Sequence, residues 1–310
     1  MRAVLLNKIV FSMEENMCRI TVFTATYNRA YILTNLYESL KKQTYTNFEW
    51  LIINDGSTDN TDSLVQSFIS NENKFNIRYI KHTGLGKHVA MNKAIKIAKG
   101  ELFMSVDSDD FLREDALEMI DKYEKSITDK NEFAGVSGLR CDLNGKVIGD
   151  EWQHNSMFID ATNFERQKYR LLGDKAEAYY TRVLKKYSLP QFEGERFMAE
   201  IIWNQIANDG YKLRWFNEKI YIGEYLEDGL TSNIIKNNLN NFNGYTYCTR
   251  EELKFKQISL LNKLKKLIVY CKLSRIKGKT YKDVAKNLNL NKVIASIVYI
   301  TSRIVKYEGI

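Results

Sequence analysis

The sequence has few of the residues that build common metal sites and disulfide frameworks. Its 310 residues include four cysteines, none in a Cys-x-x-Cys spacing, and three histidines, none of them after residue 154. Scattered cysteines argue against a zinc site and against disulfides, and they favour a reducing compartment. No stretch approaches the roughly 18 uninterrupted apolar residues typical of a membrane-spanning helix. We therefore expect a cytoplasmic protein without a transmembrane helix.

Acidic residues are scarce in one region only. Residues 251–310 contain 4 Asp and Glu against 14 Lys and Arg, a balance of +10, whereas the whole chain carries +8. Residues 1–250 are therefore close to neutral, with a balance of −2. This asymmetry suggests a C-terminal region that meets an anionic surface. The region contains no recognised nucleic-acid module, so we expect no nucleic-acid partner.

Strand-like and helix-like patterns alternate along the first half of the chain. Short β-rich runs lie at 20–24, 48–53, 77–80, 101–106 and 133–139. Apolar spacing predicts helices at 31–40, 58–70 and 85–99, with a further helix beginning at 111. Such alternation predicts an α/β fold with a doubly wound, mostly parallel sheet. The less regular second half predicts a helix at 197–208, a β run at 219–223, and basic amphipathic helices at about 251–273 and 281–307.

Three carboxylates gather where one of these strands ends. The sequence DSDD at 107–110 follows the apolar run at 101–106. Carboxylates this close repel one another, and a divalent cation that also holds a diphosphate would offset that cost, because hard cations prefer oxygen ligands. The alternative is an acidic turn that caps the next helix, since Asp is favoured at N-caps and in first turns. Taken alone, the acidic turn is the better interpretation. Other motifs at the same edge of the sheet favour the cation site instead.

Two further strands end in polar motifs at the same edge of the expected sheet, where ligands of open α/β sheets bind. They are TATYNR at 24–29 and NDGS at 54–57. Asp55 is able to accept a hydrogen bond from a nucleobase imide N–H. A third motif, GLGKH at 84–88, opens a helix, and helix N-termini beside glycines favour anions such as diphosphate.

Together these motifs resemble those of the family 2 glycosyltransferases, whose nucleotide-sugar domain has the GT-A fold. TATYNR resembles the family's opening motif, NDGSTD at 54–59 its second, and DSDD its metal motif. The pattern G-x-x-x-A-x-N-x-A at 86–94 resembles its third, and EYLEDGLT at 224–231 the end of its catalytic region. The resemblance implies a metal-dependent, inverting glycosyltransferase that uses Mn²⁺ or Mg²⁺. It implies a UDP-sugar donor and a glycan or lipid-linked glycan acceptor in surface polysaccharide synthesis.

The resemblance also assigns roles on the donor side. It implies that Asp55 binds the uracil imide, that Lys87 faces the nucleotide near the diphosphate, and that Asp109 ligates the metal. Arg29 either contacts the diphosphate or caps the following helix. The full set implied for nucleotide-sugar binding is Thr24, Thr26, Tyr27, Asn28, Arg29, Asp55, Lys87, Asn92 and Asp107.

An inverting family member needs a general base that deprotonates the acceptor hydroxyl. The family pattern is an adjacent Glu-Asp pair that leads into a helix, and Ile201 stands where that Asp is expected after Glu200. We favour Glu200 for this role, and the alternatives are Glu195 and Glu193. Many members add a late histidine ligand, which this chain lacks, so the resemblance leaves Asp109, the diphosphate and water to hold the metal, with or without Asp228.

Rival functions remain open at this level. A nucleotide-sugar-binding protein without transferase turnover would share the base pocket, and the missing Asp at 201 keeps that alternative. A sugar nucleotidyltransferase would need a glycine-rich N-terminal loop, which 24–29 does not provide. Four aromatic side chains either stack on acceptor sugars or, as we favour, simply pack: Trp203, Trp215, Tyr221 and Tyr225.

The expected domain organisation has three parts. Residues 1–18 form a loose extension, 19–235 the GT-A catalytic domain, and 236–310 a basic helical appendage. Within the catalytic domain the nucleotide-sugar half is 19–141 and the acceptor half 142–235. Apolar faces flanked by lysine in 251–310 are typical of peripheral contact with the inner face of a membrane. The alternatives are packing on the catalytic domain or a homodimer. The positions expected to form these faces are Leu261, Leu264, Leu267 and Ile268, and then Val293, Ile294, Ile297 and 300–304.

Overall fold

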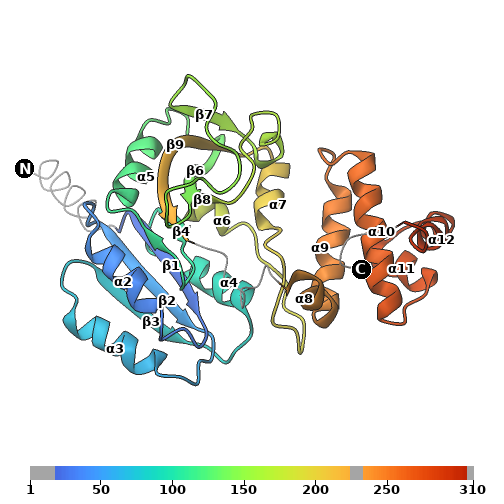
Figure 1. The fold of residues 1–310 in the computed structure, drawn as a ribbon, viewed down its shortest axis with the longest axis horizontal. Coiled ribbons are helices and arrows are strands. Elements are labelled where there is room, and N and C mark those ends of the chain that lie inside the picture. Colours follow the sequence, from blue (N-terminus) through green and yellow to red (C-terminus); the bar gives the residue numbers. More distant parts are fainter. Residues whose placement is uncertain (1–17, 224–232, 306–310) are drawn as a thin grey trace, which may run out of the picture. The chain divides into compact units, whose positions relative to one another are not determined.

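A computed structural model describes residues 18–223 and 233–305 of the protein. Within those ranges the chain forms two compact units, one of 18–188 and 211–223, the other of 189–210 and 233–305. The expected fold class is confirmed, because a mixed α/β unit with a large sheet is accompanied by a helical unit (Figure 1). The motif at 224–231, with Tyr225 and Asp228, lies outside the described residues.

Among the described residues, nine strands form one sheet in the order β3-β2-β1-β4-β8-β6-β9-β5, with β7 paired to β9. The first four strands of this order are parallel, and β8 then pairs antiparallel with both β4 and β6. Strands β7 and β8 had no counterpart in the sequence pattern. The strand bounds are β1 Ile20–Thr26, β2 Phe48–Asn54, β3 Asn76–Lys81, β4 Leu102–Ser105, β5 Phe111–Leu112, β6 Phe133–Cys141, β7 Phe158–Ala161, β8 Lys175–Tyr180 and β9 Lys212–Ile222.

Helices flank the strands of the first unit (Figure 1). Their bounds are α2 Leu33–Lys41, α3 Thr61–Asn71, α4 Lys87–Ile97, α5 Ala116–Lys125 and α6 Thr181–Leu184, with a 3₁₀ turn at Asn163–Glu165. The prediction of a helix starting at 111 is wrong. Residues 111 and 112 form β5 instead, because they pair antiparallel with Ile222 and Tyr221 of β9.

The register of the parallel strands brings their carboxyl ends together. Thr26 of β1 lies opposite Asn54 of β2, and Asn54 lies opposite Lys81 of β3. On the other side of β1, Phe23 lies opposite Ser105, the last residue of β4. The loops that follow these strands therefore leave the sheet at one edge, where ligands of open α/β sheets bind.

The second unit is helical, with bounds α7 Ile202–Asn208, α8 Ile234–Asn240, α9 Phe242–Lys254, α10 Leu260–Ile276, α11 Tyr281–Leu288 and α12 Lys292–Thr301. The helix predicted from 197 begins only at Ile202. Both long basic helices of the sequence prediction are also divided. Ser259 starts α10 as an N-cap whose hydroxyl accepts from the Asn262 amide, and Asn289 ends α11 in the left-handed conformation at φ 53°.

Residues 189–210 group with the C-terminal helices, although the sequence placed them in the acceptor half of the catalytic domain. The Glu195 carboxylate accepts hydrogen bonds from the Asn243 and Gly244 amides, each at 2.8 Å, at the start of α9. The Asn241 side-chain oxygen accepts from the Arg196 amide at 2.8 Å. The first amides of a helix have no partner within the helix, so such side-chain acceptors fasten the segment to α9.

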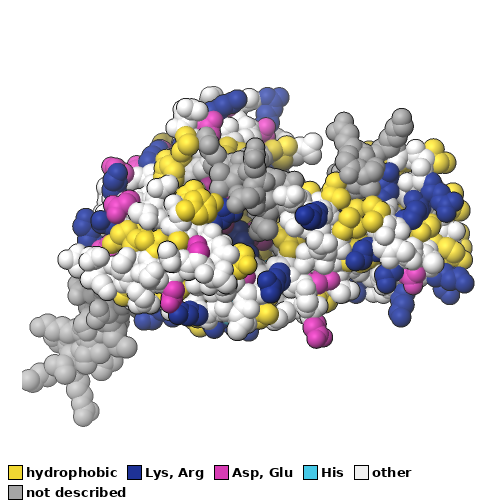
Figure 2. Space-filling model, turned by 60° about the horizontal axis from the view of Figure 1, so that its bottom comes forward, with side chains coloured by type: hydrophobic (Ala, Val, Ile, Leu, Met, Phe, Trp, Pro, Cys, Tyr) yellow, Lys and Arg dark blue, Asp and Glu magenta, His cyan; other side chains and the backbone are white. Residues whose placement is uncertain are grey.

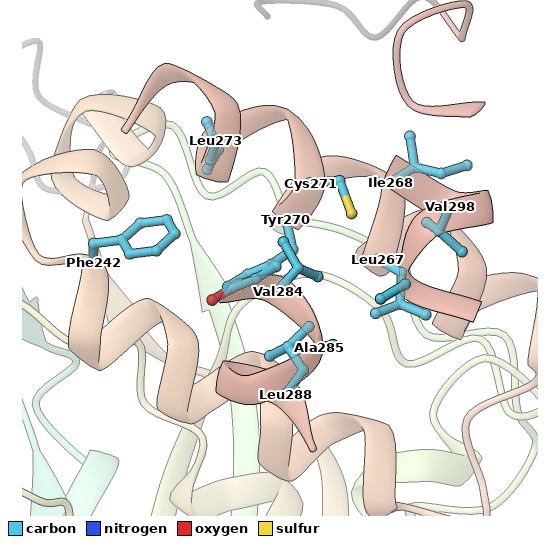
Figure 3. Close-up of a cluster of buried hydrophobic side chains, with 11 residues drawn as sticks. Phe242, Leu267, Ile268, Tyr270, Cys271, Leu273, Val284, Ala285, Leu288 and Val298 are labelled. Carbon is cyan, nitrogen blue, oxygen red and sulfur yellow. The ribbon is translucent and has the colours of Figure 1, made fainter. Parts of the chain in front are cut away.

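The helical unit has its own hydrophobic core (Figure 3). Tyr270 of α10 is fully buried, and its ring stacks on Phe242 and on Tyr245 of α9, with centroids 5.5 Å apart in each case. Leu267 and Ile268, expected on an outer face, are buried in this core. No helix within the described residues is both long enough and apolar enough to cross a membrane.

Candidate active site at the carboxyl edge of the sheet

The loops after β1 and β2 are joined by Asn28. Its backbone has φ 52°, a left-handed conformation that Asn tolerates better than most residues. Its amide donates to the Ser57 hydroxyl at 2.9 Å, and its side-chain oxygen accepts from the Thr58 amide at 2.8 Å. Asn28, which the resemblance places in the nucleobase pocket, is thus observed to join the first motif to the second.

The loop after β2 approaches the glycine loop before α4 closely. Gly56 has φ +87°, and a Cβ there would lie 3.1 Å from the Gly84 nitrogen. Glycine meets both demands, because it adopts positive φ without strain and leaves room for the neighbouring backbone. The second and third motifs are thus in direct contact.

Asp55 anchors the glycine loop. Its two carboxylate oxygens accept from the Leu85 amide at 2.9 Å and the Gly86 amide at 2.7 Å, and the His82 ring nitrogen lies 3.3 Å away. This anchoring role was missed from the sequence, although unpaired amides before a glycine-led helix were a signal for it. A carboxylate has about four acceptor positions, so the two amides leave capacity for a further donor such as an imide.

Lys87, the first residue of α4, reaches the metal motif. Its ammonium nitrogen lies 2.8 Å from a carboxylate oxygen of Asp107. Burial opposes ionisation of Asp107, but the attraction and hydrogen bond of Lys87 outweigh it and hold the pKa of Asp107 below its ordinary value. The third and fourth motifs are therefore linked by an ion pair.

Asp109 lies in the same turn but in a different electrostatic setting. Burial, together with repulsion from Asp107, raises the pKa of Asp109 above its ordinary value, while Arg29 and Lys87 act weakly in the opposite direction. A carboxylate with a raised pKa gains stability from a nearby cation. The ionised form of Asp109 would therefore be stabilised more by a metal ion than that of Asp107, which already pairs with Lys87.

Asp110 attaches the DSDD turn to strands β9 and β6. The sequence did not reveal this role. Asp110 is buried, and its carboxylate accepts from the Tyr221 hydroxyl at 2.7 Å and pairs with Arg140 at 3.0 Å. Its other oxygen lies against Gly223, where a Cβ would come within 1.8 Å of it. Burial raises the pKa of Asp110 to about 7, against the opposing attraction of Arg140. The only sequence signal for Arg140 was a charged residue at the end of a buried strand.

Tyr221 completes this support. Its hydroxyl accepts from the Asp107 amide at 3.0 Å while it donates to Asp110, and the Arg140 guanidinium lies 4.9 Å from its ring centroid. Burial and the two aspartates raise the pKa of Tyr221 well above its ordinary value, so the phenol keeps its proton. The end of β9 thus fixes both ends of the DSDD turn. We call Tyr221, Arg140 and Asp110 the turn support.

The remaining residues expected to bind the nucleotide-sugar differ in their exposure. Thr24 is buried, and its hydroxyl accepts from the Trp50 ring nitrogen at 3.0 Å. Thr26 is also buried, and its hydroxyl has no hydrogen-bond partner within residues 18–223 and 233–305. Tyr27 is half exposed, and Asn92 lies on α4, five positions after Lys87.

Arg29 lies at the start of the loop that leads to α2. Its guanidinium contacts the hydroxyl of Tyr31 and lies 5.8 Å from that ring's centroid. Its positive charge also acts on Asp109. This position suits a contact with an anion near the DSDD turn, although the contact remains a prediction.

Few of the described side chains at this edge of the sheet are available as metal ligands. The described part of the chain contains no group of three or more His, Cys, Asp or Glu side chains that could hold a metal ion. The carboxylate expected to ligate the ion is that of Asp109, and Asp107 lies in the same turn, paired with Lys87. Such an arrangement fits a hard divalent cation that takes its remaining ligands from phosphate oxygens and water.

The candidate bases belong to the helical unit. Glu200 precedes α7, and its carboxylate accepts from the Trp203 ring nitrogen at 3.1 Å. Both oxygens of Glu195 are bound to the amides at the start of α9, whereas Glu193 is exposed. Ile201 is buried, which suits an aliphatic side chain better than the carboxylate expected there. Glu195 is therefore the least available of the three, and Glu200, which the sequence pattern favours, stays the preferred candidate as a prediction.

Two of the aromatic residues prove to be packing residues, the interpretation that we favoured. Trp215 is buried, and its ring nitrogen donates to the Ala161 carbonyl at 2.9 Å. Tyr221 is buried in the turn support. Trp203 is half-buried beside Glu200.

Comparison of the sequence with known proteins identifies the family to which it is related. The sequence model described as Glycosyl transferase family 2 matches residues 21–183. Glycosyltransferase GlyG of Streptococcus pneumoniae is 36% identical over 225 residues, which cover 66% of this chain and 69% of GlyG. The chain spans 46% and 28% of the length of two further curated relatives.

Solved structures share the fold. The structure of Staphylococcus aureus TarS 1–349 in complex with UDP-GlcNAc has a TM-score of 0.59 and 20% identity, covering 92% of this chain and 79% of that one. The mannosyltransferase PcManGT of Pyrobaculum calidifontis, in complex with GDP-Man and Mn²⁺, has a TM-score of 0.53 and 16% identity, covering 92% and 73%. With the family match over residues 21–183, the chain belongs to glycosyl transferase family 2 and is a glycosyltransferase.

Proposed function

We propose that the protein transfers a sugar from a UDP-sugar to a hydroxyl of a glycan or lipid-linked glycan, in cytoplasmic synthesis of a surface polysaccharide. The observation that carries this proposal is the linkage of four loops at one sheet edge, by Asn28, Asp55 and Lys87. Interlinked loops hold their polar groups in place before a ligand binds, which lowers the ordering cost of binding.

The uridine preference rests on Asp55. A carboxylate that already accepts two amides is fixed in position, and its remaining acceptor capacity matches an imide N–H. Related folds have been solved with UDP-GlcNAc and with GDP-Man. The fold alone therefore does not determine which nucleobase is bound, and the proposed preference for uridine depends on Asp55.

The diphosphate would lie between α4 and the DSDD turn. The N-terminus of α4 offers backbone amides and the positive end of the helix dipole, and Lys87 adds a charge there. Asp109 would hold Mn²⁺ or Mg²⁺ with phosphate oxygens and water, and Asp107 would lie next to it. When bound, the ion supplies Lewis-acid stabilisation of the leaving diphosphate.

The transfer itself requires a base. We propose that Glu200 accepts the proton of the acceptor hydroxyl as its oxygen bonds to the anomeric carbon. The bond from that carbon to the diphosphate oxygen breaks on the opposite side, so the anomeric configuration inverts. General bases of this kind contribute about 10²–10⁴-fold to rate.

A donor panel tests the proposal. Purified protein would be incubated with UDP-glucose, UDP-galactose, UDP-N-acetylglucosamine, UDP-glucuronate and GDP-mannose, each with Mn²⁺ or with EDTA. Release of nucleoside diphosphate and donor affinity would be measured separately. We expect one UDP-sugar to be turned over, with EDTA abolishing the activity. Preference for GDP-mannose would contradict the role of Asp55, equal activity in EDTA would contradict the metal, and binding without turnover would contradict the transfer mechanism.

A further inference from the structure

Helix α12 is apolar on two opposite faces. Its inner face contributes Ala295 and Val298 to the core of the helical unit, and Val298 is labelled in Figure 3. Its outer face and the turn after it carry five large aliphatic side chains that are 50–80% exposed, namely Val293, Ile294, Ile297, Ile300 and Ile304. A helix that is apolar all round is normally buried on every side, so an aliphatic surface of this size calls for an apolar environment.

The start of α10 repeats the pattern. Leu260, Leu261 and Leu264 are exposed, and Lys263 and Lys265 alternate with them. We call these leucines and the five aliphatic residues of α12 and the turn after it the apolar patch. The adjoining Leu267 and Ile268 are part of the core, so the apolar patch is restricted to the α10 start and the outer face of α12.

The surroundings of the apolar patch are strongly cationic. Residues 251–305 contain 13 Lys and Arg against 3 Asp and Glu. All three acids are engaged: Glu251 with Lys254 and Glu252 with Lys266, each at 2.7 Å, and Asp283 in the cap of α11. Among residues 18–223 and 233–305, most of the lysines in this stretch therefore form no ion pair with an acidic side chain. Figure 2 shows Lys and Arg side chains beside hydrophobic ones on these helices.

We infer that the apolar patch lies on an anionic lipid surface. Aliphatic side chains enter the boundary between headgroups and acyl chains, while surrounding lysines pair with anionic headgroups. A second copy of the chain fits less well, because it would bring a matching set of unpaired cations to the same contact. Since none of the described helices can cross a membrane, the contact would be peripheral. It would hold the enzyme at the surface where a lipid-linked acceptor is found.

Vesicle flotation of the full chain tests this inference. The vesicles would contain phosphatidylcholine alone, or phosphatidylcholine with about one third phosphatidylglycerol. We expect at least roughly tenfold more protein to float with the anionic vesicles, and high salt to reduce the difference because salt screens the headgroup charge. The double variant Ile297→Glu/Ile300→Glu should lose most of this binding, by about tenfold or more.

The matched control is Leu143→Glu/Met157→Glu, which places the same two charges on exposed apolar positions of the first unit. It should float like the parent protein. Circular dichroism should show unchanged helix content in both variants, because all four side chains are exposed. If the α12 variant misfolds, Lys263→Gln/Lys265→Gln tests the inference through the charges beside the exposed leucines of α10 and should weaken anionic binding only.

Three results would overturn the inference. Flotation that is unchanged by Ile297→Glu/Ile300→Glu would exclude the apolar patch. Equal binding to neutral and anionic vesicles would exclude the role of the cations. Absence of flotation, with a dimer in sedimentation velocity that the α12 variant dissociates, would show that a second copy covers the patch.

Discussion

The two units use their polar side chains in opposite ways. At the carboxyl edge of the sheet, charged and polar groups are bound to one another, as in the pairs Lys87–Asp107 and Arg140–Asp110. In the C-terminal helices most Lys and Arg side chains form no ion pair with another part of the chain that the structure describes, and exposed aliphatic side chains lie on the same helices. The first arrangement suits a small ligand whose groups must be met one by one. The second suits an extended surface, which is recognised by charge and area rather than by individual contacts.

The residues proposed for donor binding and for acceptor activation are also divided between the two units. The residues proposed to bind the donor lie in the first unit, whereas the favoured base, Glu200, lies in the second. Substitutions in the first unit should therefore change donor affinity, and a substitution of Glu200 should change turnover alone. Four experiments test whether donor affinity and turnover depend on different units.

The largest effect is expected for Glu200→Gln. Turnover should fall by about 10²–10⁴-fold because the base is lost, while UDP-sugar affinity should be unchanged. Steady-state kinetics and donor titration would measure the two quantities. Glu193→Gln is the matched control, since Glu193 is exposed on the same segment, and it should leave both unchanged. Retained turnover in Glu200→Gln would move the base to another residue.

Asp109→Ala should remove metal-dependent UDP binding. Loss of a group that merely supports a metal ligand costs about 10–100-fold in metal affinity, so loss of the ligand itself should cost at least that much. Calorimetric titration of UDP with and without Mn²⁺ would show it. Asp129→Ala, at an exposed acid elsewhere in the first unit, is the control. Unchanged affinity in Mn²⁺ would refute the metal assignment.

Asp55→Ala should weaken UDP binding by about 1–3 kcal/mol, the usual cost of leaving a buried partner unpaired. Two contributions are expected, because Asp55 also anchors the Leu85 and Gly86 amides. Comparing UDP with CDP, which lacks the imide, separates them. A larger loss for UDP supports imide recognition, and an equal loss for both nucleotides would show that Asp55 acts only through the loop.

The smallest effect is expected for Tyr221→Phe. The substitution removes the hydroxyl that joins the Asp107 amide to Asp110, and it should lower UDP affinity in Mn²⁺ by about 1 kcal/mol. Tyr180→Phe is the control, because it also removes a buried hydroxyl bound to a carboxylate, that of Glu124 at 2.7 Å. It should lower the melting temperature without changing UDP affinity. Equal effects of both variants on UDP affinity would show that the turn support has no specific role.

Much of the first unit could be predicted from the sequence. The β1, β2 and β4 strands are mostly buried and rich in apolar and β-branched residues, and the polar motifs at their ends were visible at 24–29, 54–57 and 107–110. Parallel strands place such ends at one edge whatever the details of packing. The boundaries of the later helices could not be predicted, because amphipathic spacing continues across Ser259 and Asn289, where local caps interrupt the helix.

The sequence by itself determined the fold class, the order of the motifs and the basic character of the C-terminal helices, because these follow from local periodicity and composition. Only the tertiary structure decided which polar groups are partners. The Tyr221 hydroxyl and the Asp110 carboxylate are 111 residues apart in the chain, and Asp55 meets the amides of a loop about 30 residues later. Contacts at such separations depend on how strands are ordered and packed, which no local pattern specifies.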